Sequence, residues 1–80
     1  MNVKDAVVLR LQEICAENNI TYNDLANRSG ITPSTIYSMM DKSRRDISII
    51  TIKKICDGLE ITLSDFFDSK IFDELEPELR

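Results

Sequence analysis

The amino-acid sequence predicts a single all-α domain made of five short helices. Its 80 residues are enough for one small domain, which buries about 60% of its unfolded surface on folding. Apolar side chains recur at intervals of three and four residues, the spacing of one helix face. A short pattern typical of a helix start also occurs four times. The four copies are Ile20–Leu25, Ile31–Ile36, Ile47–Ile52 and Ile61–Phe66.

Each copy has the features of a helix N-terminus. Its Thr or Ser can accept a hydrogen bond from a free backbone N–H, and the apolar residues before and after this cap can pack together. Asp24 and Asp65 lie at the third helical position, where a carboxylate completes a capping box and suits the helix dipole. Pro33 lies at the first helical position, where its missing N–H costs nothing. Helices are therefore expected to begin near residues 21, 32, 48 and 62.

The apolar spacing extends these starts into five helices and a common core. The helices are expected over residues 3–18, 22–29, 33–42, 49–59 and 63–67. Cys15 and Cys56 fall on apolar faces and are expected to be reduced core residues, since a thiol behaves as a small hydrophobe. A disulfide is the alternative if the first and fourth helices pack together, but the cytosol disfavours it. The expected core comprises Val3, Val7, Leu11, Ile14, Cys15, Leu25, Ala26, Ile36, Met39, Met40, Ile52, Ile55, Cys56, Leu59, Leu63, Phe66 and Phe67.

The second and third helices form a tight corner. Their starts, at residues 21 and 32, lie 11 residues apart, so helix and turn are both short. Gly30 can take the left-handed conformation that ends a helix, and the small Ala26 lets the next helix cross closely. This arrangement is typical of a helix-turn-helix.

A wider set of residues makes the similarity specific. The set comprises Leu25, Ala26, Gly30, Ile31, Thr32, Ser34, Thr35, Ile36, Ser48, Thr51, Ile52, Ile55, Leu59, Ile61 and Leu63–Phe67. With these residues the chain resembles the Cro/CI-type (XRE-like) helix-turn-helix regulators from about residue 5 to residue 67. The resemblance implies a lambda-repressor-like DNA-binding domain over residues 1–68, followed by an acidic tail over residues 69–80. Many relatives place a buried Arg–Glu pair where Cys15 and Met40 stand, and an apolar replacement at both ends keeps the core consistent.

The distribution of charge is compatible with DNA binding although the net charge is −4. Residues 65–80 hold six acidic and two basic side chains, whereas residues 1–64 hold eight of each. The acidity is therefore concentrated at the C-terminus. A basic cluster remains beside the third helix, formed by Lys42, Arg44, Arg45, Lys53 and Lys54.

The resemblance implies that the helix over residues 33–42 lies in the major groove of double-stranded DNA. The implied base-reading residues are Thr32, Pro33, Ser34, Tyr37 and Ser38. The resemblance implies a phosphate contact for Tyr22. Lys42, Arg44 and Arg45 are the expected phosphate contacts of the following loop, where the two Arg side chains could instead enter a narrow minor groove. The base-reading face lacks the Arg, Lys, Asn and Gln side chains that make bidentate base contacts. Discrimination is therefore expected to depend on thymine methyl groups, water bridges and DNA shape.

Other function classes are disfavoured. The chain has no histidine, no Gly-rich phosphate loop and no nucleophile with an evident base, so neither an enzyme nor a cofactor or metal site is expected. No signal peptide, membrane span or ligand-sensing domain is evident, so we expect a cytoplasmic protein. The preferred interpretation is a sequence-specific transcriptional regulator acting as a homodimer. The alternative is a protein-interaction module, antitoxin-like or adaptor, which the acidic tail and the weak base-reading face favour.

The acidic tail carries its own apolar positions. Ile71, Phe72, Leu75 and Leu79 form a possible apolar stripe, interrupted by Pro77. A segment this short is not stable as an isolated helix. It is expected either to fold back on the core or to pair with a second copy of the chain.

Overall fold

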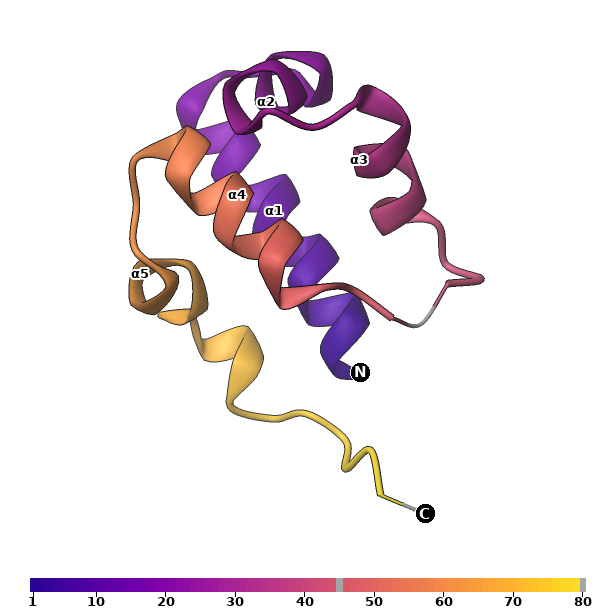
Figure 1. Ribbon diagram of the computed structural model, residues 1–80. Coiled ribbons are helices and arrows are strands. Elements are labelled where there is room, and N and C mark those ends of the chain that lie inside the picture. Colours follow the sequence, from indigo (N-terminus) through magenta and orange to yellow (C-terminus); the bar gives the residue numbers. More distant parts are fainter. Residues whose placement is uncertain (45, 80) are drawn as a thin grey trace.

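The computed structural model describes residues 1–44 and 46–79, and the regular structure in these ranges is helical (Figure 1). The elements are α1 (Val3–Asn18), α2 (Tyr22–Ser29), α3 (Pro33–Met40), α4 (Ile49–Leu59), α5 (Leu63–Phe67) and the 3₁₀ turn η1 (Lys70–Phe72). The all-α prediction of five helices is confirmed. All bounds agree with the sequence-based ones except the end of α3.

The third helix ends at Met40. The sequence-based end at residue 42 was therefore wrong by two residues. Asp41 adopts an extended conformation (φ −68°, ψ 118°). Its carboxylate accepts hydrogen bonds from the Ser43 backbone N–H at 2.9 Å and from the Ser43 hydroxyl at 2.8 Å. An Asp that binds the backbone two residues ahead favours a turn over continued helix.

The helix termini follow the expected capping chemistry. Thr21, Thr32, Ser48 and Thr62 are the N-caps of α2 to α5, and α2 and α5 have complete capping boxes. Gly30 ends α2 in the left-handed region at φ +68°. Local hydrogen bonds thus define where these helices begin and end.

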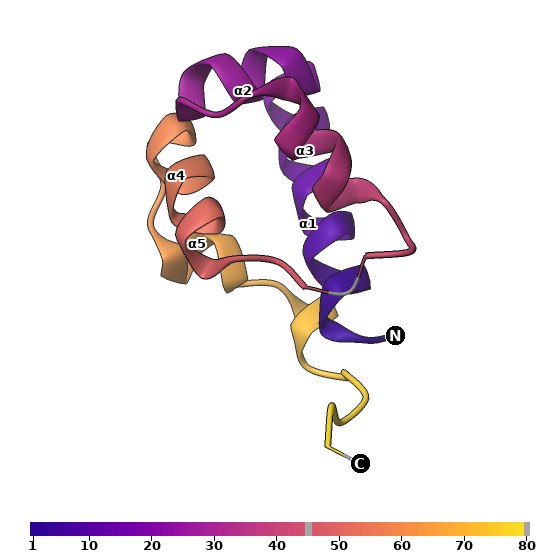
Figure 2. The ribbon, with the colours of Figure 1, turned by 45° about the vertical axis from the view of Figure 1, so that its right-hand side comes forward.

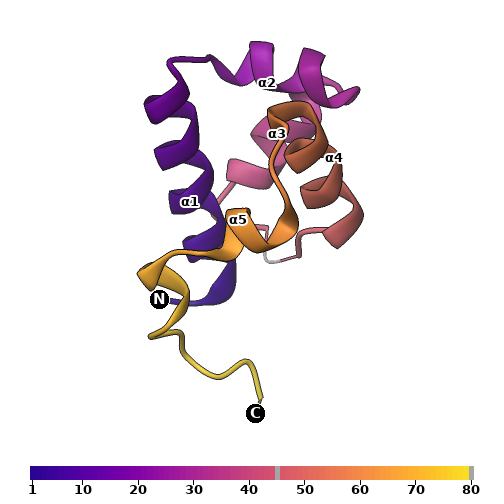
Figure 3. The ribbon, with the colours of Figure 1, turned by 90° about the vertical axis from the view of Figure 1, so that its left-hand side faces the viewer.

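The helices enclose one core. Figure 1 shows α2 across one end of α1 and α4, with α3 beside it, and Figure 3 shows α5 next to the N-terminal half of α1. Arg10 joins α5 to α1, because its guanidinium donates to the backbone oxygens of Phe66 at 2.6 Å and Asp65 at 2.8 Å. The largest fully buried side chains are Phe66, Leu11, Leu25, Ile36, Ile55 and Cys56.

The predicted core needs three kinds of correction. Val3 is exposed, so its assignment to the core was wrong. The expected core residues that are only partly buried, while still packing against the core, are Met40, Leu59, Leu63 and Phe67. Three buried residues were not anticipated: Lys4, Ala6 and Ser29. Cys15 and Cys56 are buried and free, as predicted, and burial raises the pKa of both thiols.

The first part of the acidic tail folds back on the domain. The Phe67 and Phe72 rings meet edge to face with centroids 5.0 Å apart, and Phe72 packs against the core. The Glu76 backbone N–H donates to the Met1 carbonyl at 3.1 Å. Leu79, by contrast, is 92% exposed.

No helix in residues 1–44 and 46–79 is long and apolar enough to span a membrane.

Close packing of α2 against α4 depends on a glycine. A Cβ placed on Gly58 would lie 2.6 Å from the Ser29 hydroxyl oxygen and 2.8 Å from the Arg28 carbonyl carbon and oxygen. Backbone atoms cannot yield as the end of a flexible side chain can. Hydrogen at this position therefore lets the end of α2 rest directly on α4.

Gly58→Ala is expected to lower the free energy of unfolding by about 1–3 kcal/mol, because overpacking outweighs the better helix propensity of Ala. Urea unfolding followed by circular dichroism measures the change. Lys54→Ala, at an exposed position of the same helix, is the control and should stay within about 0.5 kcal/mol. Equal or greater stability of Gly58→Ala would contradict the tight α2–α4 contact.

Candidate nucleic-acid interface

Buried apolar side chains and the hydrogen bonds of the turn hold α2 and α3 in a tight corner. Leu25 and Ala26 of α2 and Ile36 of α3 are fully buried. The N–H groups of Gly30 and Ile31 both donate to the Ala26 carbonyl, the latter at 3.1 Å. Three residues, Gly30 to Thr32, thus separate the two helices. The corner is a helix-turn-helix in which one face of α3 packs on the core and the other faces away from it.

The outward side of α3 carries most of the expected base-reading residues. Thr32, Pro33, Ser34 and Tyr37 are exposed, and Tyr37 retains 56% of its accessible surface. Ser38 is only half exposed, so its side chain is less available than the sequence suggested. The N-terminal half of α3 is therefore the accessible part.

The Thr32 hydroxyl also acts as the N-cap of α3. It accepts a hydrogen bond from the Thr35 backbone N–H at 3.3 Å and lies 3.1 Å from the Thr35 hydroxyl oxygen. It therefore stabilises the first turn of α3. Its hydrogen-bonding capacity is already partly used, unlike that of Ser34, whose side chain makes no hydrogen bond to the described residues.

Tyr22 and Tyr37 form an aromatic pair across the corner. Their rings meet edge to face with centroids 6.0 Å apart and planes at 84°. Tyr22 is the first residue of α2 and is half-buried. Its ring supports Tyr37, so the Tyr37 side chain has a preferred direction although more than half of it is exposed.

The loop from α3 to α4 carries the exposed basic residues Lys42 and Arg44. Within the described part of the chain, neither side chain takes part in an ion pair. The Ser43 hydrogen bonds hold the pKa of the neighbouring Asp41 carboxyl below its usual value, with smaller contributions from Arg44 and Lys4. Asp41 therefore stays ionised and reduces the positive charge of the loop. Arg45, expected to contact phosphate, lies outside the described residues.

Lys53 and Lys54, the other lysines of the expected basic cluster, lie on α4. The Lys53 ammonium forms an ion pair with Asp57 one helical turn away, and both side chains are exposed. Lys54 is exposed on the same helix. Among the described residues, Lys42 and Arg44 are therefore the exposed cations of the loop after α3, and Lys54 adds a further exposed charge on α4.

Lys4 fixes this loop to α1. Lys4 was not identified from the sequence as a functional residue. Its ammonium donates to the Asp41 carbonyl at 2.8 Å and to the Arg44 carbonyl. Only 6% of the residue is exposed. A signal existed in the sequence, because Lys4 lies three residues before Val7 and seven before Leu11, and so closer to the centre of the buried helix face than Val3.

The comparisons with known proteins agree with this geometry. The family described as "Cro/C1-type HTH DNA-binding domain" matches residues 10–70. The chain is also similar to a solved structure titled "Crystal structure of the prophage Lp1 protein 11", with 32% identity and a TM-score of 0.82. This similarity covers 94% of the chain and all of the other protein. A search of curated proteins gives no match. The helix-turn-helix corner and the family match over most of its length show that this chain belongs to the Cro/C1-type helix-turn-helix DNA-binding family.

Proposed function

We propose that this protein is a sequence-specific transcriptional regulator that inserts α3 into the major groove of operator DNA. The observation that carries the proposal is the division of α3 into two faces. Ile36 and Met39 are buried, while Pro33, Ser34 and Tyr37 are exposed at the helix-turn-helix corner. A helix that is fixed on one side and free at its N-terminal end fits the docking geometry of this class of domain.

The proposed base readers differ in their chemistry. Tyr37 and Pro33 offer apolar contact to thymine methyl groups, and the Ser34 hydroxyl can donate to or accept from several bases. Thr32 and Ser38 are assigned supporting contacts, because the first is engaged in the helix cap and the second is half-buried. This set favours DNA shape and water-mediated contacts over strong direct recognition.

The proposed phosphate contacts flank this face. Lys42 and Arg44 extend from the loop after α3, and the sequence places Arg45 next to them. Arg is suited to phosphate because its planar guanidinium donates two parallel hydrogen bonds. The Tyr22 hydroxyl, at the start of α2, is the proposed contact on the opposite side of the corner.

A homodimer on a two-fold symmetric site completes the proposal. Exposed apolar side chains support it, since Ile49 and Ile50 at the start of α4 are more than half exposed. Val3 and Ile49 line one groove of about 330 Å³ together with Glu78. Exposed apolar side chains beside such a groove are the surface that we propose a second copy covers. We assign residues 1–68 to DNA binding and, within the tail over residues 69–80, the part around Glu78 and Leu79 to support of this dimer.

The DNA-binding proposal is tested by titrating duplex DNA with the full chain at several salt concentrations. The protein with Lys42→Ala plus Arg44→Ala is expected to bind more weakly across sequences, and its log–log salt slope should fall by about one to two. Lys70→Ala, which removes an exposed charge of the tail, is the control and should leave the slope nearly unchanged. An unaltered slope in the double variant would exclude these residues from the interface. Absence of binding by the parent near 50 mM salt would favour the protein-interaction alternative.

Tyr37→Ala is expected to change which sequences are preferred, because Tyr37 is the one large exposed side chain on α3 within the described residues. Selection of binding sites from random DNA measures the preference. Tyr37→Phe is the control, since it keeps the ring and its contact with Tyr22, and it should retain the preference for thymine at the affected position. Identical selected sites for Tyr37→Ala and the parent would show that Tyr37 does not read bases.

The dimer is tested by sedimentation of the full chain at micromolar concentrations. Ile49→Ser plus Ile50→Ser is expected to shift the protein toward monomer, whereas Leu9→Ser, at an exposed apolar position of α1, should not. If all three proteins sediment as monomers up to high micromolar concentrations, dimers do not form in the absence of DNA and the proposed contact is wrong.

A further inference from the structure

Lys4 is a buried cation with two backbone partners in one loop. Its ammonium donates to the Asp41 carbonyl at 2.8 Å and to the Arg44 carbonyl. These two oxygens lie on either side of Lys42 and Ser43. A single side chain of α1 therefore binds both ends of the short segment from which Lys42 extends.

The cost of burying this ammonium indicates what it does. A charged group taken out of water is strongly unfavourable unless it is hydrogen-bonded, and here the partners are two carbonyls. No carboxylate forms an ion pair with Lys4 within the described residues. The interaction therefore orients the backbone of the loop without using the side-chain charges of Lys42 or Arg44.

A second interaction closes the loop from the other side. The Asp41 carboxylate binds the backbone N–H and the hydroxyl of Ser43. Lys4 holds the carbonyls of the segment while Asp41 holds an N–H, so the backbone over residues 41–44 is restrained through both kinds of group. Figure 2 shows the loop returning from α3 past the N-terminal end of α1.

We propose that Lys4 is a positioning residue for DNA binding, which orders the α3–α4 loop so that Lys42 and Arg44 face the phosphate backbone. This inference rests on the proposed function. Ordering the loop before binding removes an entropy cost that would otherwise oppose the complex. Lys4 acts through the loop and does not itself contact DNA, because only 6% of the residue is exposed and its ammonium binds the Asp41 and Arg44 carbonyls.

The proposal is tested with Lys4→Met, which keeps the length of the side chain and removes its donors. Duplex DNA binding is measured as a function of salt for the parent, Lys4→Met and the control Lys70→Met. Lys4→Met is expected to bind about tenfold more weakly at low salt with a salt slope lower by about one. Lys70→Met, which loses the same charge at an exposed position, should change affinity less than about twofold.

A double-mutant cycle separates positioning from a general loss of stability. In the protein with Lys42→Ala plus Arg44→Ala, adding Lys4→Met should not weaken DNA binding further, because the residues that Lys4 positions are gone. A loss that persists in this background, or an unchanged affinity in the parent background, would overturn the proposal. If the parent itself does not bind DNA, the proposed function is wrong. The contact between Lys4 and the loop is then tested separately.

The loop contact is tested on the parent alone, which covers the case in which Lys4→Met does not fold. NMR relaxation should give backbone order parameters near 0.85 for Ser43 and Arg44, equal to those of the helices. Values below about 0.6 would show a mobile loop and would contradict the positioning role.

Discussion

The direct contact of α2 with α4 is the constraint on which the rest of the structure depends. Gly58 and the buried Ser29 leave no room for a larger side chain between the two helices. This fixes the C-terminal end of α2, from which Gly30 turns the chain into α3. The direction of α3, and thus the side of the molecule that its exposed face occupies, follows from that contact. The stability of the fold and the direction of the proposed recognition helix therefore share a steric origin.

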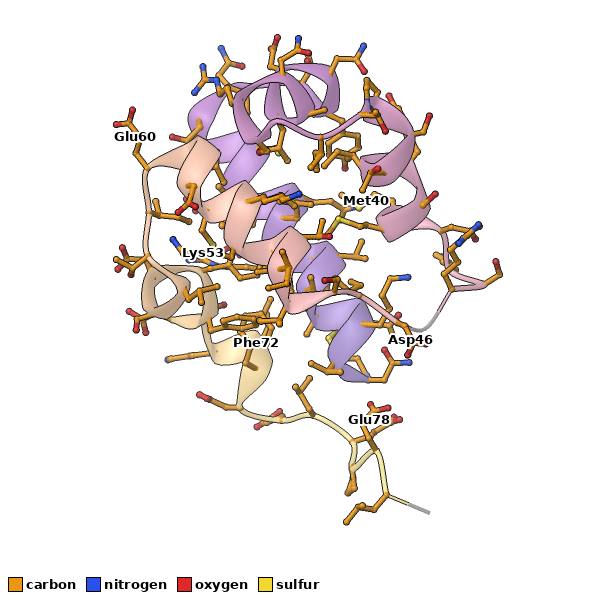
Figure 4. The ribbon with its side chains drawn as sticks, in the orientation of Figure 1. Met40, Asp46, Lys53, Glu60, Phe72 and Glu78 are labelled. Carbon is orange, nitrogen blue, oxygen red and sulfur yellow. The ribbon has the colours of Figure 1, made fainter. Side chains whose placement is uncertain are left out.

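The candidate interface depends on a second kind of interaction besides the contact of α2 with α4. α3 is positioned by apolar burial of Ile36 and Met39, whereas the loop behind it is positioned by hydrogen bonds from Lys4. Figure 4 shows Met40 directed toward the helices and Asp46 on the loop that leaves α3. Apolar packing thus orients the face proposed to read bases, and a buried cation orients the segment proposed to contact phosphate. In the proposed complex, the weak hydrogen-bonding capacity of α3 makes a well-ordered loop more important for affinity.

Local features were predictable from the sequence, and features that depend on distant partners were not. Helix starts at residues such as Thr21 and Thr62 depend on a cap and a carboxylate three residues away, so they could be recognised directly. The residues of the α3 face followed from helical spacing. Lys4 was missed because its partners lie 37 and 40 residues away and charged side chains are rarely buried. The place of Phe72 against Phe67 likewise depends on how the tail folds back.

NMR mapping of the full chain with a duplex DNA at low salt tests most directly whether α3 is the recognition helix. If α3 is the recognition helix, the largest amide shift changes occur at the start of α3, from Thr32 to Ser38, and in the loop at Lys42 to Arg44. Small changes are expected in the C-terminal half of α4 and in η1. Changes concentrated in α1 or the acidic tail, with α3 unaffected, would contradict the assignment of α3 as the recognition helix.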